Sequence, residues 1–255
     1  MMTYLALLAL VAVAALLFKA RGVIAVILCK SKMQAGDYDG ALRTVRWVSL
    51  GVPNPLLLHR EALTLSFADR PAEAERCYRK ALGMVQSHSA YQWERLYASL
   101  GFALIDLARY DEAEQSFHRA IEMGDLTGNS QNGLAELRLV QGVETEKALD
   151  YACQAIEHAK RRPDKRVPEA YHAHRAWALA LVGRNDAARY ALSEALRVPK
   201  RGSFASVFGI AEEHWLAGMA LLAMQQPEEA REHFQIGHDA DPRGKYGRCC
   251  GEHLG

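Results

Sequence analysis

Small and large apolar residues alternate along most of the chain at intervals that suit short amphipathic helices packed in pairs. In the clearest stretch the apolar positions are Tyr97, Leu100, Gly101, Leu104, Ala108, Tyr110, Ala113, Phe117, Ala120 and Ile121. Intervals of three and four residues place such side chains on one face of a helix. This stretch therefore predicts two short helices that face each other through these residues.

The pair pattern occurs six times along the chain. Its marker is a small residue in the second helix, found at Ala41, Ala74, Ala113, Ala148, Ala188 and Ala230. Alanine suits this position because helix axes about 8–10 Å apart leave no room for a larger side chain. An internal period of about 34 residues is typical of a solenoid, in which each unit buries its apolar face only against its neighbours. Such a fold favours a binding scaffold over an enzyme.

These repeats resemble the tetratricopeptide repeat (TPR) family over Gly22–Pro242. The copy at Glu94–Thr127 resembles the family pattern most closely, whereas the copy at Asn129–Arg162 has Glu136 where the pattern has Gly or Ala. The resemblance implies an all-α fold, a right-handed TPR-type solenoid of about six helix pairs. We expect the solenoid to span residues 22–244 and residues 245–255 to form a flexible tail.

An uncharged apolar segment, Thr3–Phe18, precedes the repeats. As a helix it would span about 24 Å, a little less than the ~30 Å hydrocarbon core of a bilayer, so a membrane anchor is one interpretation. A cleaved signal peptide is a second interpretation, although no positive charge precedes the apolar run. A third is a buried helix that caps the solenoid, although the segment has no polar face.

Charge favours the membrane anchor among these interpretations. The apolar segment is followed, before any acidic residue, by Lys19, Arg21, Lys30 and Lys32. Positive residues mark the cytoplasmic flank of a membrane span. We therefore expect residues 1–21 to form one transmembrane helix with its basic flank, preceding repeats that lie in the cytoplasm.

Composition and motifs add few constraints. The 255 residues carry a formal net charge of +1, which gives no support for a nucleic-acid partner. The cysteines number five, and an odd count without regular spacing is not a disulfide framework. No phosphate-binding loop, nucleophile elbow or zinc-protease motif is present. We expect no enzymatic activity, no cofactor and no metal site; the alternative is a redox or metal-responsive role for the adjacent Cys249 and Cys250.

In the TPR family, the first helices of successive repeats line a concave groove that holds the partner. The positions of this chain that match the groove, and that we select for partner binding, are His59, Arg60, Arg95, Phe102, His174, Trp177, Trp215 and Met219. The groove so predicted is apolar and aromatic with arginines at one end, and Trp and Arg are frequent hot spots of interfaces. The alternative for Trp177 and Trp215 is packing between neighbouring repeats.

Together these features predict a membrane-tethered scaffold that binds a partner protein or peptide, with homo-oligomer formation left open. The arrangement is similar to that of bacterial membrane-anchored TPR adaptors of envelope assembly. The alternative is a periplasmic or secreted TPR component of an export, pilus or envelope assembly apparatus.

Overall fold

The computed structural model describes residues 22–49, 54–84, 92–164, 166–197 and 207–255. Within these residues the regular structure is helical, and no strand is present. A helix over residues 22–34 is followed by α2 (Tyr38–Ser49), α3 (Pro55–Phe67), α4 (Pro71–Leu82), α5 (Trp93–Asp106), α6 (Tyr110–Glu122), α7 (Asn129–Gln141), α8 (Thr145–Arg161), α9 (Glu169–Leu181), α10 (Asn185–Leu196), α11 (Val207–Ala223), α12 (Pro227–Ala240) and α13 (Lys245–Glu252).

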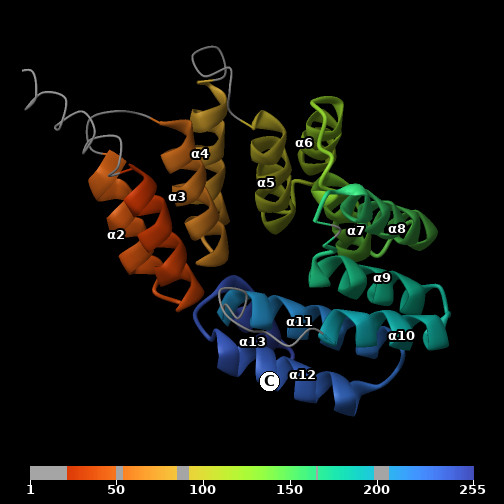
Figure 1. Cartoon of the computed structure of the whole chain (residues 1–255). Helices are drawn as coiled ribbons and strands as arrows, with labels where there is room; N and C mark the ends of the chain where they lie inside the picture. Colours follow the sequence, from red (N-terminus) through yellow and green to blue (C-terminus); the bar gives the residue numbers. More distant parts are fainter. Residues whose placement is uncertain (1–21, 50–53, 85–91, 165, 198–206) are drawn as a thin grey trace, which may run out of the picture.

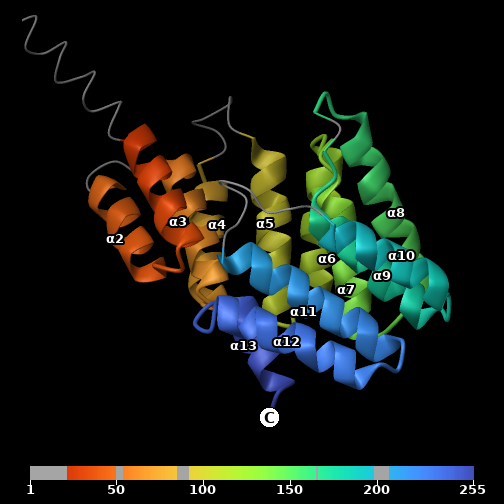
Figure 2. The same ribbon diagram turned by 60° about the horizontal axis from the view of Figure 1, so that its bottom comes forward.

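Successive helices form six pairs, from residues 22–34 with α2 to α11 with α12, and each pair packs on the next. The first helices of neighbouring pairs also contact one another, α3 with α5, α5 with α7, α7 with α9 and α9 with α11. We call the side that these first helices line the concave face. The row of pairs curves, so that α13 lies at the lower ends of α3 and α5, with α11 and α12 packed on it (Figure 1); Figure 2 shows the same arrangement with the bottom turned forward. The predicted all-α solenoid of six helix pairs is confirmed.

Small residues are buried where the helices cross. The six marker alanines, from Ala41 to Ala230, are all 0% exposed. The fully buried ring of Phe117 in α6 illustrates the reason. A methyl group added at Gly101 of α5 would come within 2.6 Å of this ring, and a methyl group at Gly133 of α7 would also overlap the ring. Phe117 thus fits between two successive first helices because both present glycine, and it joins one repeat to the next.

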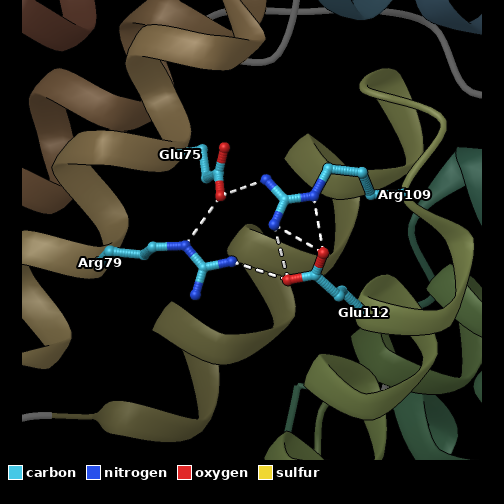
Figure 3. A network of polar contacts seen from close by, with 4 residues as sticks. All are labelled: Glu75, Arg79, Arg109 and Glu112. Carbon is cyan, nitrogen blue, oxygen red and sulfur yellow. Dashed lines mark hydrogen bonds and ion pairs between the residues drawn. The ribbon is translucent and has the colours of Figure 1, made fainter.

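On the other side of the solenoid, a four-residue ion-pair network joins the second and third pairs (Figure 3). Glu75 of α4 accepts hydrogen bonds from Arg79 Nε at 2.8 Å and from Arg109 Nη1 at 2.6 Å. Glu112 of α6 accepts from the same two guanidinium groups. Because the Glu75 side chain is only 14% exposed, it is the best-shielded member of the network.

Replacing Glu75 by glutamine is expected to lower the free energy of unfolding by about 1 kcal/mol or less, since exposed guanidinium partners limit the gain from each pair. The loss should shrink when NaCl is raised from about 0.05 M to about 0.5 M, because salt screens the interaction. Urea unfolding followed by circular dichroism measures both effects. Glu228→Gln, an exposed carboxylate in the first turn of α12, is the matched control. An equal loss in the control would show that the network is not the cause.

The C-terminal segment differs from the prediction of a flexible tail over residues 245–255, because Lys245–Glu252 form α13. Its buried face, which includes Tyr246 and Cys250, packs on α11 and α12. Its charged face reaches across the concave side: Lys245 Nζ lies 2.6 Å from Asp106 Oδ1 at the end of α5, and Arg248 pairs with Asp69 after α3. The helix therefore connects the last pair of the solenoid with the second and third.

No helix in the described part of the chain is both long and apolar enough to cross a membrane. The longest that it contains, α8 and α11, have 17 residues each and so span about 25 Å. The predicted transmembrane residues, 1–21, lie outside the described residues. The prediction of a single-pass membrane protein with cytoplasmic repeats is corrected on this finding and is not used further.

Candidate functional site

A cavity of about 530 Å³ opens on the concave face between the second and fifth pairs. We call it the basic pocket. Its walls come from α3, the start of α5, the loop before α7, the end of α8 and the first turn of α9, and they are lined by Leu56, His59, Arg60, Leu63, Gln92, Arg95, Ala98, Ser99, Asp125, Thr127, Asn129, Arg162 and Tyr171. Its volume lies in the range of about 300–1,000 Å³ that is usual for ligand sites. The superhelix brings these residues together from four repeats.

The lining carries three guanidinium groups and one carboxylate. Arg60 has no ion-pair partner among the described residues, and its Nε is buried without a hydrogen bond. Arg95 donates from Nη1 to Gln92 Oε1 at 2.7 Å, a neutral acceptor. Arg162 pairs with the exposed Asp164 at 2.8 Å. The basic pocket therefore carries positive charge that its own walls do not neutralise.

The one carboxylate of the lining, Asp125, is occupied by the start of α7. Its Oδ1 accepts from the amide and the hydroxyl of Thr127, and its Oδ2 accepts from those of Ser130, at 2.6–2.9 Å. Burial raises the pKa of Asp125, but these hydrogen bonds outweigh it and the pKa lies below its usual value. Asp125 is thus ionised, and both of its carboxylate oxygens accept hydrogen bonds at the start of α7. It therefore does not pair with the arginines of the pocket.

His59 lines the basic pocket as an uncharged side chain. Its Nε2 lies 3.2 Å from Ser99 Oγ, and its ring packs edge-on against Tyr78 at 5.9 Å between centroids. Burial, followed by the positive charges of Arg60 and Arg95, lowers the pKa of His59 to about 3. The imidazole therefore stays uncharged near neutral pH and offers hydrogen bonding without changing the charge of the site.

The structure brings three of the eight predicted partner residues, His59, Arg60 and Arg95, into this one pocket. Others pack inside the protein. Phe102 is half-buried and lies edge-on to Phe117 at 5.1 Å between ring centroids. His174 is 1% exposed, with Nδ1 2.8 Å from Ala170 O. Burial thus places these two in the packing between helices rather than in an open groove.

The remaining three predicted residues lie on α9 and α11. Trp177 is 5% exposed and packs edge-on against Trp215 at 5.9 Å between centroids. Trp215 in turn packs on Tyr246 of α13 at 5.4 Å, and Met219 is half-buried against the same core. The aromatic part of the predicted groove is therefore covered by the chain's own C-terminal helix, as the packing alternative for Trp177 and Trp215 requires.

Charged side chains of α5, α7, α11 and α13 form a buried cluster where α13 packs on the concave face. Lys245 of α13 and Asp106 of α5 form an ion pair whose side chains are each 13% exposed. Burial lowers the pKa of Lys245, but Asp106 and Glu136 together outweigh it, so the pKa lies above its usual value. Glu136 of α7 lies 3.5 Å from His174 Nε2. Burial and the charge of Glu136 raise the pKa of Glu212, on α11, to about 7.

Sequence reasoning missed the other half of the basic pocket. Arg162, Tyr171 and Asn129 were not among the predicted partner residues, and they lie in no binding motif that the sequence analysis identified. The groove positions of the family also lie on first helices alone, whereas Arg162 follows the second helix α8. The available signal was the local excess of arginine and lysine before α9, which the sequence could not place opposite Arg60 and Arg95.

The described residues offer little for redox or metal chemistry. No group of three or more His, Cys, Asp or Glu side chains within them is arranged to hold a metal ion. The five cysteines are free thiols. Burial raises the pKa of Cys250 to about 12, with a further rise from Cys249, so this thiol is protonated at neutral pH and poorly reactive.

Comparison with known proteins supports the repeat family and the fold. Residues 94–123 match the tetratricopeptide repeat model. No curated protein sequence matches the chain. The chain is similar to a solved tetratricopeptide repeat protein from Parabacteroides merdae ATCC 43184, at 19% identity and a TM-score of 0.61, with 91% of this chain and 82% of that chain covered.

Two further solved structures have the same fold. A thermophilic TPR protein of Thermus thermophilus is 17% identical, with a TM-score of 0.55 over 79% of this chain and 99% of that chain. NprR, solved in complex with its cognate peptide NprX, is 15% identical, with a TM-score of 0.62 over 89% of this chain and 69% of that chain. Identities this low show the fold alone. Residues 94–123 thus match one tetratricopeptide repeat, and the described helix pairs form a solenoid with the fold of solved TPR proteins.

Proposed function

We propose that this protein is an interaction scaffold that binds a segment of a partner protein, or a peptide, on its concave face at the basic pocket. The observation that carries the proposal is the pocket itself, an open cavity of about 530 Å³ lined by residues of four repeats. The fold is consistent with this role, since NprR shares it and was solved with a peptide bound. Concave surfaces of solenoids generally serve as extended binding surfaces.

The proposed site differs in chemistry from an apolar-aromatic groove. Trp177 and His174 are buried, and Trp215 is covered by Tyr246 of α13, so they support the scaffold rather than contact the partner. The partner residues that we propose are His59, Arg60 and Arg95, joined by Leu63 and Arg162. No cofactor and no catalytic step are part of this proposal, and homo-oligomer formation stays a prediction.

Substitution of Leu63 tests the site. Peptides selected from a random library against the purified chain are expected to bind at least about tenfold more weakly to Leu63→Arg, because the longer side chain fills the pocket and adds a charge to it. Fluorescence anisotropy of labelled peptides measures the affinity.

The matched control for this experiment is Tyr190→Arg, at a side chain of α10 that is 63% exposed and does not line the pocket. Circular dichroism verifies that both variants remain folded. If the selected peptides lose the same affinity in the control as in Leu63→Arg, the concave face is not the binding site and the proposal is wrong.

A further inference from the structure

We propose that the basic pocket recognises a dianionic phosphate group, carried by a phosphorylated side chain of the bound partner segment. The inference rests on the proposed function, because it names the chemistry of the group that the same concave site takes. It arises from the charge balance of the pocket, the hydrogen-bond donors on its walls and its size.

Charge balance is the first argument. Of the three arginines in the lining, Arg162 pairs with the exposed Asp164, whereas Arg60 and Arg95 form no ion pair among the described residues, which leaves two positive charges unpaired. Asp125 is already engaged by Thr127 and Ser130, so it does not compensate the arginines. A phosphate ester carries about −1.5 to −2 charges at neutral pH, which matches this excess, whereas a single carboxylate leaves half of it unpaired.

Unused hydrogen-bonding capacity is the second argument. Several arginines elsewhere on the solenoid pair with glutamates, as Arg79 and Arg109 do with Glu75 and Glu112 (Figure 3). Arg60 instead leaves its buried Nε without any hydrogen bond, and Arg95 contacts only the amide of Gln92 among the described side chains. A buried donor without a partner is unfavourable, and a phosphate oxygen that accepts from Arg60 Nε would supply the missing acceptor.

The walls add neutral donors around these guanidinium groups. Ser99 brings a hydroxyl group, and Gln92 and Asn129 bring side-chain amides. Guanidinium groups hold phosphate by paired, charge-assisted hydrogen bonds, and three oxygens of the ester can use several such donors at once. The volume of about 530 Å³ leaves room for the side chain and neighbouring backbone that carry the phosphate.

The pH dependence of binding separates phosphate from carboxylate. His59 has a pKa of about 3, Asp125 has a pKa below its usual value, and Tyr171 has one above it, so none of these lining groups changes charge between about pH 5.5 and 7.5. Arginines keep their charge throughout. A phosphate ester loses its second proton near pH 6, so its dianion rises about fourfold over this interval, whereas aspartate carboxylates are ionised at both ends.

The experiment uses three capped peptides as probes: Gly-phosphoserine-Gly, the same peptide without phosphate, and Gly-Asp-Asp-Gly. Isothermal titration calorimetry with the whole chain measures their dissociation constants at low salt. We expect binding of the phosphopeptide, with about fourfold higher affinity at pH 7.5 than at pH 5.5, and no detectable binding of the unphosphorylated peptide. The two-aspartate peptide should bind more weakly and without this pH dependence.

Two substitutions locate the site. Arg60→Gln and Arg95→Gln are each expected to weaken phosphopeptide binding at least about tenfold, since each removes a charge-assisted contact. Arg119→Gln is the control, because it removes the same charge from an exposed α6 residue that pairs with Glu122 outside the pocket. Circular dichroism checks that the three variants keep the helical content of the natural chain.

Three outcomes would overturn the phosphate assignment: no phosphopeptide binding at millimolar concentration, equal binding of the two-aspartate peptide with a flat pH profile, or the same loss in Arg119→Gln as in Arg95→Gln. The proposed function fails separately. Library peptides that bind the natural chain but not Leu63→Arg would support the scaffold role even if one of these three outcomes overturned the phosphate assignment.

Discussion

Replacing Phe117 by alanine is expected to lower the free energy of unfolding by about 3–5 kcal/mol, the range found when large aromatic side chains are removed from cores. Phe117 is 0% exposed, and its ring fits against Gly101 of α5 and Gly133 of α7. Both glycines lack the side chain that could move into the space, so the cavity remains largely unfilled. Phe117 also joins two neighbouring repeats, and a solenoid is stabilised mainly by such interfaces.

Urea and thermal unfolding followed by circular dichroism measure this loss. Phe117→Leu, which retains much of the volume, should lose less than the alanine variant. Tyr190→Ala, at an exposed position of α10, should change stability by no more than about 0.5 kcal/mol. A Phe117→Ala variant as stable as the Tyr190→Ala variant would contradict the packing described here.

Replacing Lys245 by methionine is expected to cost about 3–5 kcal/mol at neutral pH, because it leaves a buried charge without its partner. Methionine keeps the length of the side chain, so the loss reflects charge more than volume. Asp106, Glu136 and Glu212, whose charges all interact with that of Lys245, then remain in the interior without the ammonium group. We expect α13 to detach from α5 in this variant.

The loss should depend on pH in a defined direction. Burial raises the pKa of Asp106, and burial with the charge of Glu136 raises that of Glu212 to about 7. Both carboxyl groups therefore bind protons more readily in the folded state, so stability is highest below their unfolded pKa values and falls as pH rises through the folded ones. Without Lys245 the folded values rise further, and Lys245→Met should lose more stability at about pH 8 than at about pH 5.5.

Chemical unfolding at the two pH values measures the difference, and small-angle scattering reports whether the particle opens. Lys160→Met removes an exposed lysine that pairs with Glu157, and it should leave both quantities unchanged. Asp106→Leu combined with Lys245→Met should recover part of the loss, because it removes the orphaned carboxylate. A single variant that keeps natural stability at both pH values would show that the ion pair does not hold α13 in place.

The position of α13 also bears on where a partner binds. Tyr246 packs on Trp215, and Lys245 spans to Asp106, so the helix occupies the aromatic part of the concave face. The basic pocket, lined by α3, α5 and the starts of α7 and α9, remains open. Because α13 covers the aromatic part of the concave face, the side chains that remain accessible for binding are those of the basic pocket, which include Arg60, Arg95 and Arg162.

The repeat pattern was readable from the sequence because the helix contacts it encodes are local. The spacing of Ala113 and Phe117 is set by the turn of an α-helix, and small residues are required wherever two axes approach closely. The prediction of six helix pairs and their crossing alanines followed from these rules. In the fourth pair, Glu136 stands where the family pattern has Gly or Ala, and the structure buries it beside His174, a contact that the repeat pattern did not predict.

The sequence by itself thus determined the helix pairs, their order and the residues at their crossings. The tertiary structure alone decided that α13 forms, since its segment carries Gly247 and Gly251 and is stabilised by packing on α11 and α12 rather than by helix propensity. It alone decided that Arg162 meets Arg60 and Arg95. The curvature of a solenoid is the sum of small rotations at every interface between repeats. The local spacing of residues in the sequence does not determine this sum, so residues of distant repeats cannot be placed opposite one another from the sequence.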